Sequence, residues 1–248
     1  MGERTVSVSY YSDLLCVWAY VAQVRLDELR RQFGGRVIID HRFVSIFGDT
    51  ASRIGGRWSD RGGFEGYARH VHEVAGDFDH VELHDQVWLR NAPAGSYAAH
   101  AFVRAVALAV ADGAIEEIAT QRADGAHGAA ATTAATLPRR PLVEELTWQL
   151  RLAFFRDLKD IARSDVQLTV AESMGLPPAV ILERIEDGRA QAALAADHES
   201  AAEKQISGSP TFLMNHGRQK LYGNVGYRVV EANVEELLHE PEEGASWC

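Results

Sequence analysis

The sequence predicts an α/β fold in which the two parts of one sheet are separated by a long helical insertion. Residues 5–47 have the pattern of a strand, a helix and a second strand, and residues 211–239 have that of two short strands and a closing helix. We therefore expect a sheet-bearing domain from residues 1–48 and 205–240. Residues 49–204 form the predicted insertion, with loops followed by a helical bundle, and residues 241–248 a flexible tail.

The N-terminal unit is predicted from a change in hydrophobic period. Residues 5–11 alternate large apolar side chains with small polar ones, which is typical of a half-buried strand. A Ser-Asp pair with helix-capping oxygens then precedes a helical pattern over residues 16–33, which a Gly-Gly pair ends. The nearly continuous apolar run at residues 36–47 indicates a second strand buried inside a sheet.

The insertion is predicted from helical spacing of its apolar residues. Residues 48–95 are irregular, and residues 123–141 are compatible with either a loop or a continued helix. The C-terminal strands are expected at residues 211–215 and 219–222, before a helix over 227–239. The predicted helices of the insertion are 65–74, 96–111, 143–161, 165–174, 178–188 and 189–204.

Charge and hydropathy exclude several classes of function. The chain carries 35 acidic and 25 basic side chains, a formal net charge of −10. Such an excess repels phosphate backbones and anionic lipid, which disfavours a nucleic-acid or membrane-surface role. Apolar runs are too short to span a bilayer, and the N-terminus lacks a signal-peptide pattern, so we expect a soluble cytoplasmic protein.

Two cysteines, Cys16 and Cys248, lie near opposite ends of the chain. This number excludes a disulfide framework and an all-cysteine zinc site. The histidines at His70 and His72 lack a companion Glu or Cys at metal-binding spacing, so neither a metal nor a nucleotide cofactor is expected.

Cys16 lies where the first strand becomes the first helix. Unpaired N–H groups at a helix N-terminus favour a thiolate, which is the nucleophilic form of cysteine. The alternative is an inert cysteine that fills the corner between strand and helix. Position alone leaves both interpretations open.

A second feature is Pro210, at the start of a predicted strand in Gly208-Ser209-Pro210-Thr211-Phe212. Proline is tolerated at strand starts, and X–Pro bonds are the ones in which a cis form is accessible. A cis Pro210 would turn the N–H and C=O of Ser209 outward toward an extended peptide or glutathione. An ordinary trans proline in a turn is the alternative.

The residues around Cys16 and Pro210 resemble those of a known family. The segments Y-S-D-L-L-C-V-W-A-Y (11–20), G-S-P-T-F (208–212) and L-Y-G-N-V-G-Y-R (221–228) resemble the DsbA-like branch of the thioredoxin superfamily. The chain is most similar there to cytoplasmic DsbA-like proteins and to 2-hydroxychromene-2-carboxylate isomerase or kappa-class glutathione transferase relatives. The resemblance implies a thioredoxin-like sheet with a helical insertion and a catalytic Cys16. It also implies a substrate edge at Ser209, Pro210 and Thr211, with Trp18 beside it.

One departure from the family pattern affects the expected chemistry. The family carries C-x-x-C, whereas here Ala19 occupies the second cysteine position. Without a resolving thiol the site cannot hold a local disulfide, so the resemblance implies a monothiol oxidoreductase that forms a mixed disulfide. Its partner is expected to be glutathione as co-substrate or a protein thiol. Cys248 reaches this site only with an entropically poor return of the tail.

The sequence is also compatible with two other functions. In the isomerase and kappa-class relatives a serine at the position of Cys16 attends the glutathione sulfur, so a glutathione-dependent isomerase or transferase acting on a small electrophilic substrate is one alternative. A redox-inactive member that binds a partner through the Ser209 edge is the other. The apolar helices of the insertion are compatible with a homodimer.

Overall fold

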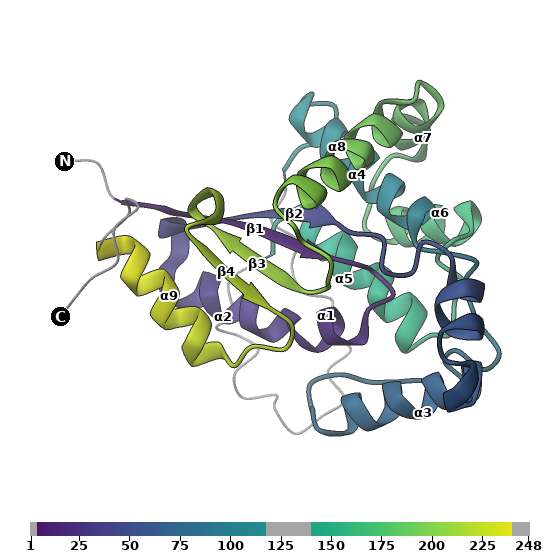
Figure 1. Cartoon of the computed structure of the whole chain (residues 1–248). Coiled ribbons are helices and arrows are strands. Elements are labelled where there is room, and N and C mark those ends of the chain that lie inside the picture. The colour runs from purple at the N-terminus through teal and green to yellow at the C-terminus, as the bar shows by residue number, and fades with distance from the viewer. Residues whose placement is uncertain (1–3, 118–139, 240–248) are drawn as a thin grey trace.

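A four-stranded mixed sheet joins the two ends of the chain in the computed structural model, which describes residues 4–117 and 140–239 (Figure 1). The strand order is β2-β1-β3-β4. β1 (Val6–Ser12) runs parallel to β2 (Val37–Phe43) and antiparallel to β3 (Thr211–Met214), which pairs with β4 (Gln219–Tyr222). The predicted thioredoxin-like α/β fold is thus present, whereas the predicted tail and most of the 123–141 segment lie outside the described residues.

Two helices cover one face of the sheet. α2 (Gln23–Phe33) and α9 (Tyr227–His239) pack their apolar sides against the alternating residues of β1. Each large side chain buried there contributes about 1.5–3 kcal/mol relative to the exposed state. The shared core consists of Val6, Val8, Tyr10, Leu26, Leu29, Phe33, Val37, Phe212, Met214, Val230, Val234 and Leu237.

The prediction that residues 36–47 form an interior strand was wrong. β2 is an edge strand that ends at Phe43, and Ile38 on it is 58% exposed. The apolar run continues past the strand because Val44 and Phe47 are buried in the loop that follows, not because the strand extends.

The first helix is divided in two. The sequence predicts one helix over residues 16–33, but α1 (Val17–Val21) is separated from α2 by Ala22. Gly34 then adopts a φ of 54°, in the left-handed region that favours glycine, and ends α2.

The insertion is built mainly of helices, which lie beyond the carboxyl end of β1 (Figure 1). A π-helical turn at Ala51–Gly56 and a 3₁₀ turn at Ser59–Arg61 occupy part of the region predicted as loops. The helices are α3 (Gly63–Gly76), α4 (Tyr97–Ala111), α5 (Leu142–Phe155), α6 (Ser164–Ser173), α7 (Pro178–Glu186) and α8 (Arg189–Glu203).

α5 is shorter than its apolar pattern predicts. It ends at Phe155, and Leu158 adopts a φ of 55°, which a right-handed helix cannot contain. Ile161, in the loop after α5, is nevertheless fully buried. Because this buried apolar residue continues the spacing of the apolar residues of α5, the sequence predicts a helix that is too long.

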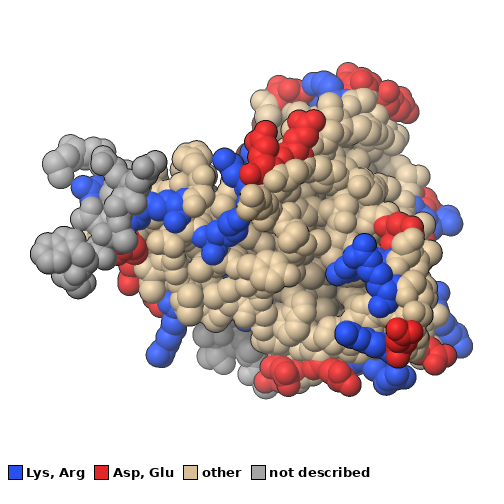
Figure 2. Space-filling model, in the orientation of Figure 1, with Lys and Arg blue, Asp and Glu red and all other residues tan. Residues whose placement is uncertain are grey.

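The insertion and the start of α1 share one hydrophobic core. Leu14, Cys16 and Tyr20 belong to the same buried cluster as Phe102 and Phe154. None of the helices within residues 4–117 and 140–239 is long and apolar enough to cross a membrane. Figure 2 shows that charged side chains lie mainly around the margin of the face drawn in Figure 1.

Candidate functional site

Cys16 lies at the junction that the sequence predicts for it. It is the N-cap residue of α1, its N–H donates to the backbone oxygen of Asp13, and its own C=O accepts from the N–H groups of Ala19 and Tyr20. Its side chain is 5% exposed. The cysteine is therefore fixed by backbone hydrogen bonds and almost enclosed.

The loop before β3 packs directly against this cysteine. The Ser209–Pro210 peptide bond is cis, and the Cys16 thiol donates to the Ser209 carbonyl oxygen at 3.3 Å. The Asp13 N–H donates to Ser209 Oγ at 2.9 Å, which is a second link between the two loops. The Ser209 carbonyl thus faces the sulfur rather than turning outward as expected, while the Ser209 N–H makes no hydrogen bond within the described residues.

The remaining predicted binding residues divide by exposure. Trp18 is partly exposed and packs against the large core cluster. Thr211 is buried, and its hydroxyl donates to the Gly208 carbonyl at 3.0 Å, so its side chain holds the loop in place. Pro210 is buried, and its carbonyl accepts the N–H of Gly223 at 2.8 Å.

Burial raises the pKa of the Cys16 thiol above its ordinary value, and the negative charge of Asp13 raises it further. A hydrogen bond with the Ser209 side chain and the N–H groups of Ala19 and Trp18 lower the pKa of the thiol, but not enough to offset burial. The direction is opposite to the one expected from the helix N-terminus. In this closed arrangement the neutral thiol is the favoured form.

Asp13 organises the loops around the cysteine instead of capping α1. Its carboxylate accepts the N–H of Leu15 and of Phe47, both at 2.9 Å, and the hydroxyl of Ser96 at 2.8 Å. Burial alone would raise its pKa, but the interaction with His100 and the hydrogen bonds from the N–H groups of Phe47 and Leu15 lower it. Asp13 therefore stays ionised and joins the Cys16 loop to the loop after β2 and to the start of α4.

Two further residues near the sulfur were not identified from the sequence. His100 on α4 accepts the N–H of Leu14 through Nε2 at 3.1 Å and stacks on Phe43. Tyr67 on α3 is buried, and burial together with the charges of Cys16 and Asp13 raises its pKa well above the usual range. Its phenol stays protonated, and its hydroxyl makes no hydrogen bond within the described residues.

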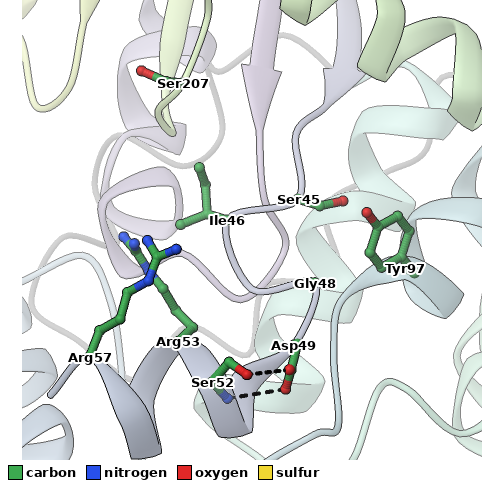
Figure 3. Close-up of a pocket in the computed structure, with 9 residues that line it drawn as sticks. All are labelled: Ser45, Ile46, Gly48, Asp49, Ser52, Arg53, Arg57, Tyr97 and Ser207. Carbon is green, nitrogen blue, oxygen red and sulfur yellow. Dashed lines mark hydrogen bonds between the residues drawn. The ribbon is translucent and has the colours of Figure 1, made fainter. Parts of the chain in front are cut away.

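A pocket of about 490 Å³ borders this site (Figure 3). Ser207, two residues before Ser209, forms part of its wall, and the loop after β2 forms another part. The pocket could not be predicted from the sequence, because its lining residues come from parts of the chain that are far apart, at residues 45–57, 97 and 207. They include Ser45, Ile46, Arg53, Arg57, Tyr97 and Ser207.

The site has no second thiol in the described part of the chain. Ala19, at the resolving position, is fully buried, and Cys16 is a free cysteine. Cys248 lies outside the described residues. Within residues 4–117 and 140–239, no group of three or more His, Cys, Asp or Glu side chains is placed to hold a metal ion.

Solved structures with the same fold include thiol–disulfide proteins. A candidate protein disulfide isomerase from Nitrosomonas europaea superposes with a TM-score of 0.69 at 13% identity, covering 96% of this chain and 100% of the other. The cytosolic disulfide reductase DsbM from Pseudomonas aeruginosa gives 0.60 at 17%, covering 92% and 98%. A 2-hydroxychromene-2-carboxylate isomerase gives 0.54 at 17%, covering 95% and 97%.

Sequence comparisons give the family directly. No curated protein sequence matches the chain significantly. The family model described as a DSBA-like thioredoxin domain matches residues 7–235, which includes Cys16, the helical insertion and the Ser209–Pro210 loop. The chain belongs to the DSBA-like thioredoxin domain family.

Proposed function

We propose that the protein is a monothiol thiol–disulfide oxidoreductase in which Cys16 forms a mixed disulfide with glutathione or with a protein thiol. The observation that carries this proposal is the contact between Cys16 Sγ and the Ser209 carbonyl at the cis-Pro210 loop, next to an N–H on Ser209 that has no partner in the described chain. Family membership and the likeness to a cytosolic disulfide reductase support it. A reducing cytoplasm, where thiols outnumber disulfides, is the compartment that suits such an activity.

The exchange needs one protein sulfur. The Cys16 thiolate attacks one sulfur of an incoming disulfide, the new S–S bond forms as the old one breaks, and the leaving sulfur departs as a thiolate. A second external thiolate then attacks the mixed disulfide, regenerates Cys16 and leaves as part of a new disulfide. Ala19 has no sulfur with which to perform that second attack internally.

Burial of Cys16 sets the condition for this reaction. Because the thiol is favoured in the closed site, a ligand that enters must displace the Ser209 contact or admit solvent before the thiolate forms. The free N–H of Ser209 offers an extended disulfide a donor beside the sulfur. Trp18 offers a partly exposed apolar surface at the same end of α1.

The direct test is intact mass after incubation with oxidised glutathione. A Cys248→Ser protein restricts the reaction to Cys16, and we expect the mass of one glutathione moiety to be added, faster at higher pH. The double variant Cys16→Ser, Cys248→Ser should gain nothing. Absence of an adduct on the Cys248→Ser protein, even at pH values where a free thiol reacts, would overturn the proposal.

A glutathione-dependent isomerase is the second candidate, and the raised pKa of Cys16 favours it specifically. A protonated Cys16 can donate a hydrogen bond to the sulfur of bound glutathione without exchanging with it. The candidates separate in the Cys16→Ser variant, because a hydroxyl preserves a donor but not a sulfur nucleophile. If the Cys16→Ser variant still converts an aromatic electrophile, the result supports the isomerase. If the variant loses all thiol exchange, the result supports the oxidoreductase.

A redox-inactive binding role is the remaining alternative. Ala19→Cys places a thiol at the position of the family's resolving cysteine, although Ala19 is fully buried and the new side chain must displace its neighbours. Dithiol oxidase activity in this variant would show that the scaffold retains the geometry for disulfide chemistry.

A further inference from the structure

The pocket that borders the Ser209–Pro210 loop is lined by two arginines that form no ion pair within the described residues. Arg53 lies in the π-helical turn and Arg57 directly follows it, four residues later. Arg53 is partly buried and Arg57 is exposed, and neither guanidinium forms a hydrogen bond or an ion pair within the described residues. The partly buried Arg104 and the buried Arg140 are, by contrast, paired with carboxylates. In a chain with ten more acidic than basic side chains, this leaves a local positive site unneutralised.

The two guanidinium groups face the same part of the pocket. Figure 3 shows both side chains extending toward the side where Ile46 and Ser207 lie. Asp49 also lines the pocket, but its carboxylate is occupied: Ser52 donates to it through its N–H at 3.2 Å and through its hydroxyl at 2.5 Å (Figure 3). The Asp49 carboxylate therefore points toward Ser52 and away from the two guanidinium groups.

Hydroxyl groups complete the lining. The Tyr97 hydroxyl makes no hydrogen bond within the described residues, and its ring packs edge-on to His198. Ser45 Oγ is 3.0 Å from His198 Nε2, and Ser207 is exposed. Paired guanidinium groups with nearby hydroxyl donors match the geometry of a carboxylate, which arginine binds through two parallel N–H bonds.

Hydrogen bonds join the loops that line this pocket to the segment of Asp13 and Cys16. The carboxylate of Asp13, three residues before Cys16, holds the N–H of Phe47 between two lining residues, and also holds Ser96 next to Tyr97. Ser207 precedes the Ser209 carbonyl that contacts Cys16 Sγ. Walls of the pocket and the atoms around the sulfur thus belong to the same loops. Arg53 and Cys16 also both act on the pKa of Tyr67, in opposite directions.

From this arrangement we propose that Arg53 and Arg57 bind a carboxylate of the compound that reacts at Cys16, so that the protein selects small anionic thiols and disulfides over neutral ones. This inference rests on the proposed exchange at Cys16 for its role, but the anion site itself does not depend on that chemistry. The pocket, at about 490 Å³, has room for a small organic acid.

The test compares two disulfides of similar size, dithiodiacetate and its neutral diamide, reacting with the Cys248→Ser protein. The ratio of their rates of adduct formation measures the preference for a carboxylate. A hydrogen bond to a charged group contributes about 1.5–3 kcal/mol, so Arg53→Gln together with Arg57→Gln should lower this ratio about tenfold or more. The rate with the neutral diamide should change little. Arg90→Gln, an exposed arginine outside the pocket, is the matched control.

A binding measurement separates this inference from the exchange chemistry. Calorimetric titration of the Cys16→Ser, Cys248→Ser protein with dithiodiacetate should show binding that the double arginine variant loses and the diamide never shows. If the Cys16→Ser, Cys248→Ser protein binds dithiodiacetate but the Cys248→Ser protein forms no adduct, the anion site is supported and the exchange at Cys16 is refuted. An unchanged rate ratio in the double arginine variant, or an equal loss in Arg90→Gln, would refute the anion site.

Discussion

The reactivity of Cys16 depends on a balance between two effects at one atom. The N–H groups of Trp18 and Ala19 at the start of α1 favour a thiolate, whereas burial and the charge of Asp13 favour the thiol. A one-turn helix supplies few such donors, and a nearly enclosed sulfur loses the solvation of its charged form, so burial dominates. The neutral thiol is therefore the favoured form of Cys16 in this arrangement.

The first prediction concerns this balance. In the Cys248→Ser protein the Cys16 thiolate, followed by its ultraviolet absorbance, should have a titration midpoint above the ordinary cysteine value of 9.0. Alkylation at neutral pH should accordingly be slower than that of a small free thiol. The Cys16→Ser, Cys248→Ser protein supplies the baseline. A thiolate signal already complete at pH 7 would show that the backbone donors, and not burial, control the sulfur.

A second residue-scale prediction concerns Tyr67. Its hydroxyl is protonated and unpaired within the described residues, and it is within electrostatic range of Cys16. Such a donor can stabilise a thiolate during exchange, so Tyr67→Phe should slow adduct formation with oxidised glutathione several-fold while leaving thermal stability nearly unchanged. Tyr227→Phe, which removes a hydroxyl on α9 that donates to Gln32, is the control. Equal rates in the wild-type and Tyr67→Phe proteins would leave Tyr67 with a packing role only.

At the scale of elements, buried charges attach the insertion to the sheet. Glu144 on α5 accepts hydrogen bonds from Gln23 and Arg30 of α2, and its carboxylate is hydrogen-bonded to His41 Nε2 on β2 at 2.9 Å. Burial alone would raise its pKa, but the contacts with His41 and Arg30 hold it well below its usual range. Glu144 thus joins α5 to α2 and to β2 through buried polar contacts.

Removing that charge should weaken the fold in a pH-dependent way. Glu144→Gln leaves Arg30 and His41 without their shared anion, and breaking a buried pair costs about 3–5 kcal/mol. Because the folded-state pKa lies below the ordinary 4.5, the stabilisation is complete above pH 4.5 and is lost as the pH falls through the folded-state value. Urea unfolding should therefore show a wild-type advantage at pH 7 that shrinks below pH 4.5.

The control for this substitution is Glu183→Gln, which removes an exposed partner of Arg184. Exposed pairs contribute about 0.2–1 kcal/mol, so its effect should be small at every pH. Equal losses for Glu144→Gln and Glu183→Gln at pH 7 would contradict the importance of the buried network.

A close backbone approach between two loops shapes the pocket. A Cβ on Gly95 would lie 2.3 Å from the Gly48 carbonyl oxygen, whereas a Cβ on Gly35 would meet no atom within 4 Å. Overpacking of this kind costs about 1–3 kcal/mol, so Gly95→Ala should lower the melting temperature by several degrees and Gly35→Ala should not. Differential scanning fluorimetry measures both melting temperatures. Equal values for the two variants would show that the Gly48 loop can move to accommodate the added methyl group.

The sequence predicted what local patterns determine. Alternation in β1 and helical spacing in α9 predict those elements closely, and the surroundings of Cys16 and Pro210 predict the site. It could not predict contacts that join distant segments: Asp13 meets Phe47 and Ser96 only after folding. For the same reason it left the burial of the sulfur open, and it missed the pocket of Arg53 and Arg57, where an Arg-x-x-x-Arg spacing was the only local signal.

At the scale of the whole molecule, the net charge of −10 opposes the arginine pocket. An approaching dicarboxylate is repelled by the molecule as a whole and attracted by Arg53 and Arg57 at close range. Salt screens both contributions, because the Debye length falls from about 30 Å at 0.01 M to about 10 Å at 0.1 M and Arg57 is exposed to solvent. As the ionic strength rises, loss of the repulsion raises the rate and loss of the attraction lowers it.

This difference gives the last prediction. Between 0.01 M and 0.1 M salt, the Cys248→Ser protein should react with dithiodiacetate at a rate that stays level or falls, because screening of the arginines offsets relief of the overall repulsion. With Arg53→Gln and Arg57→Gln added, only the repulsion remains, so salt should accelerate the reaction. The neutral diamide should show no salt dependence in either protein. If the two proteins responded to salt in the same direction and to the same degree, net charge alone would govern the approach of anions, and the arginine pair would have no part in selecting the substrate.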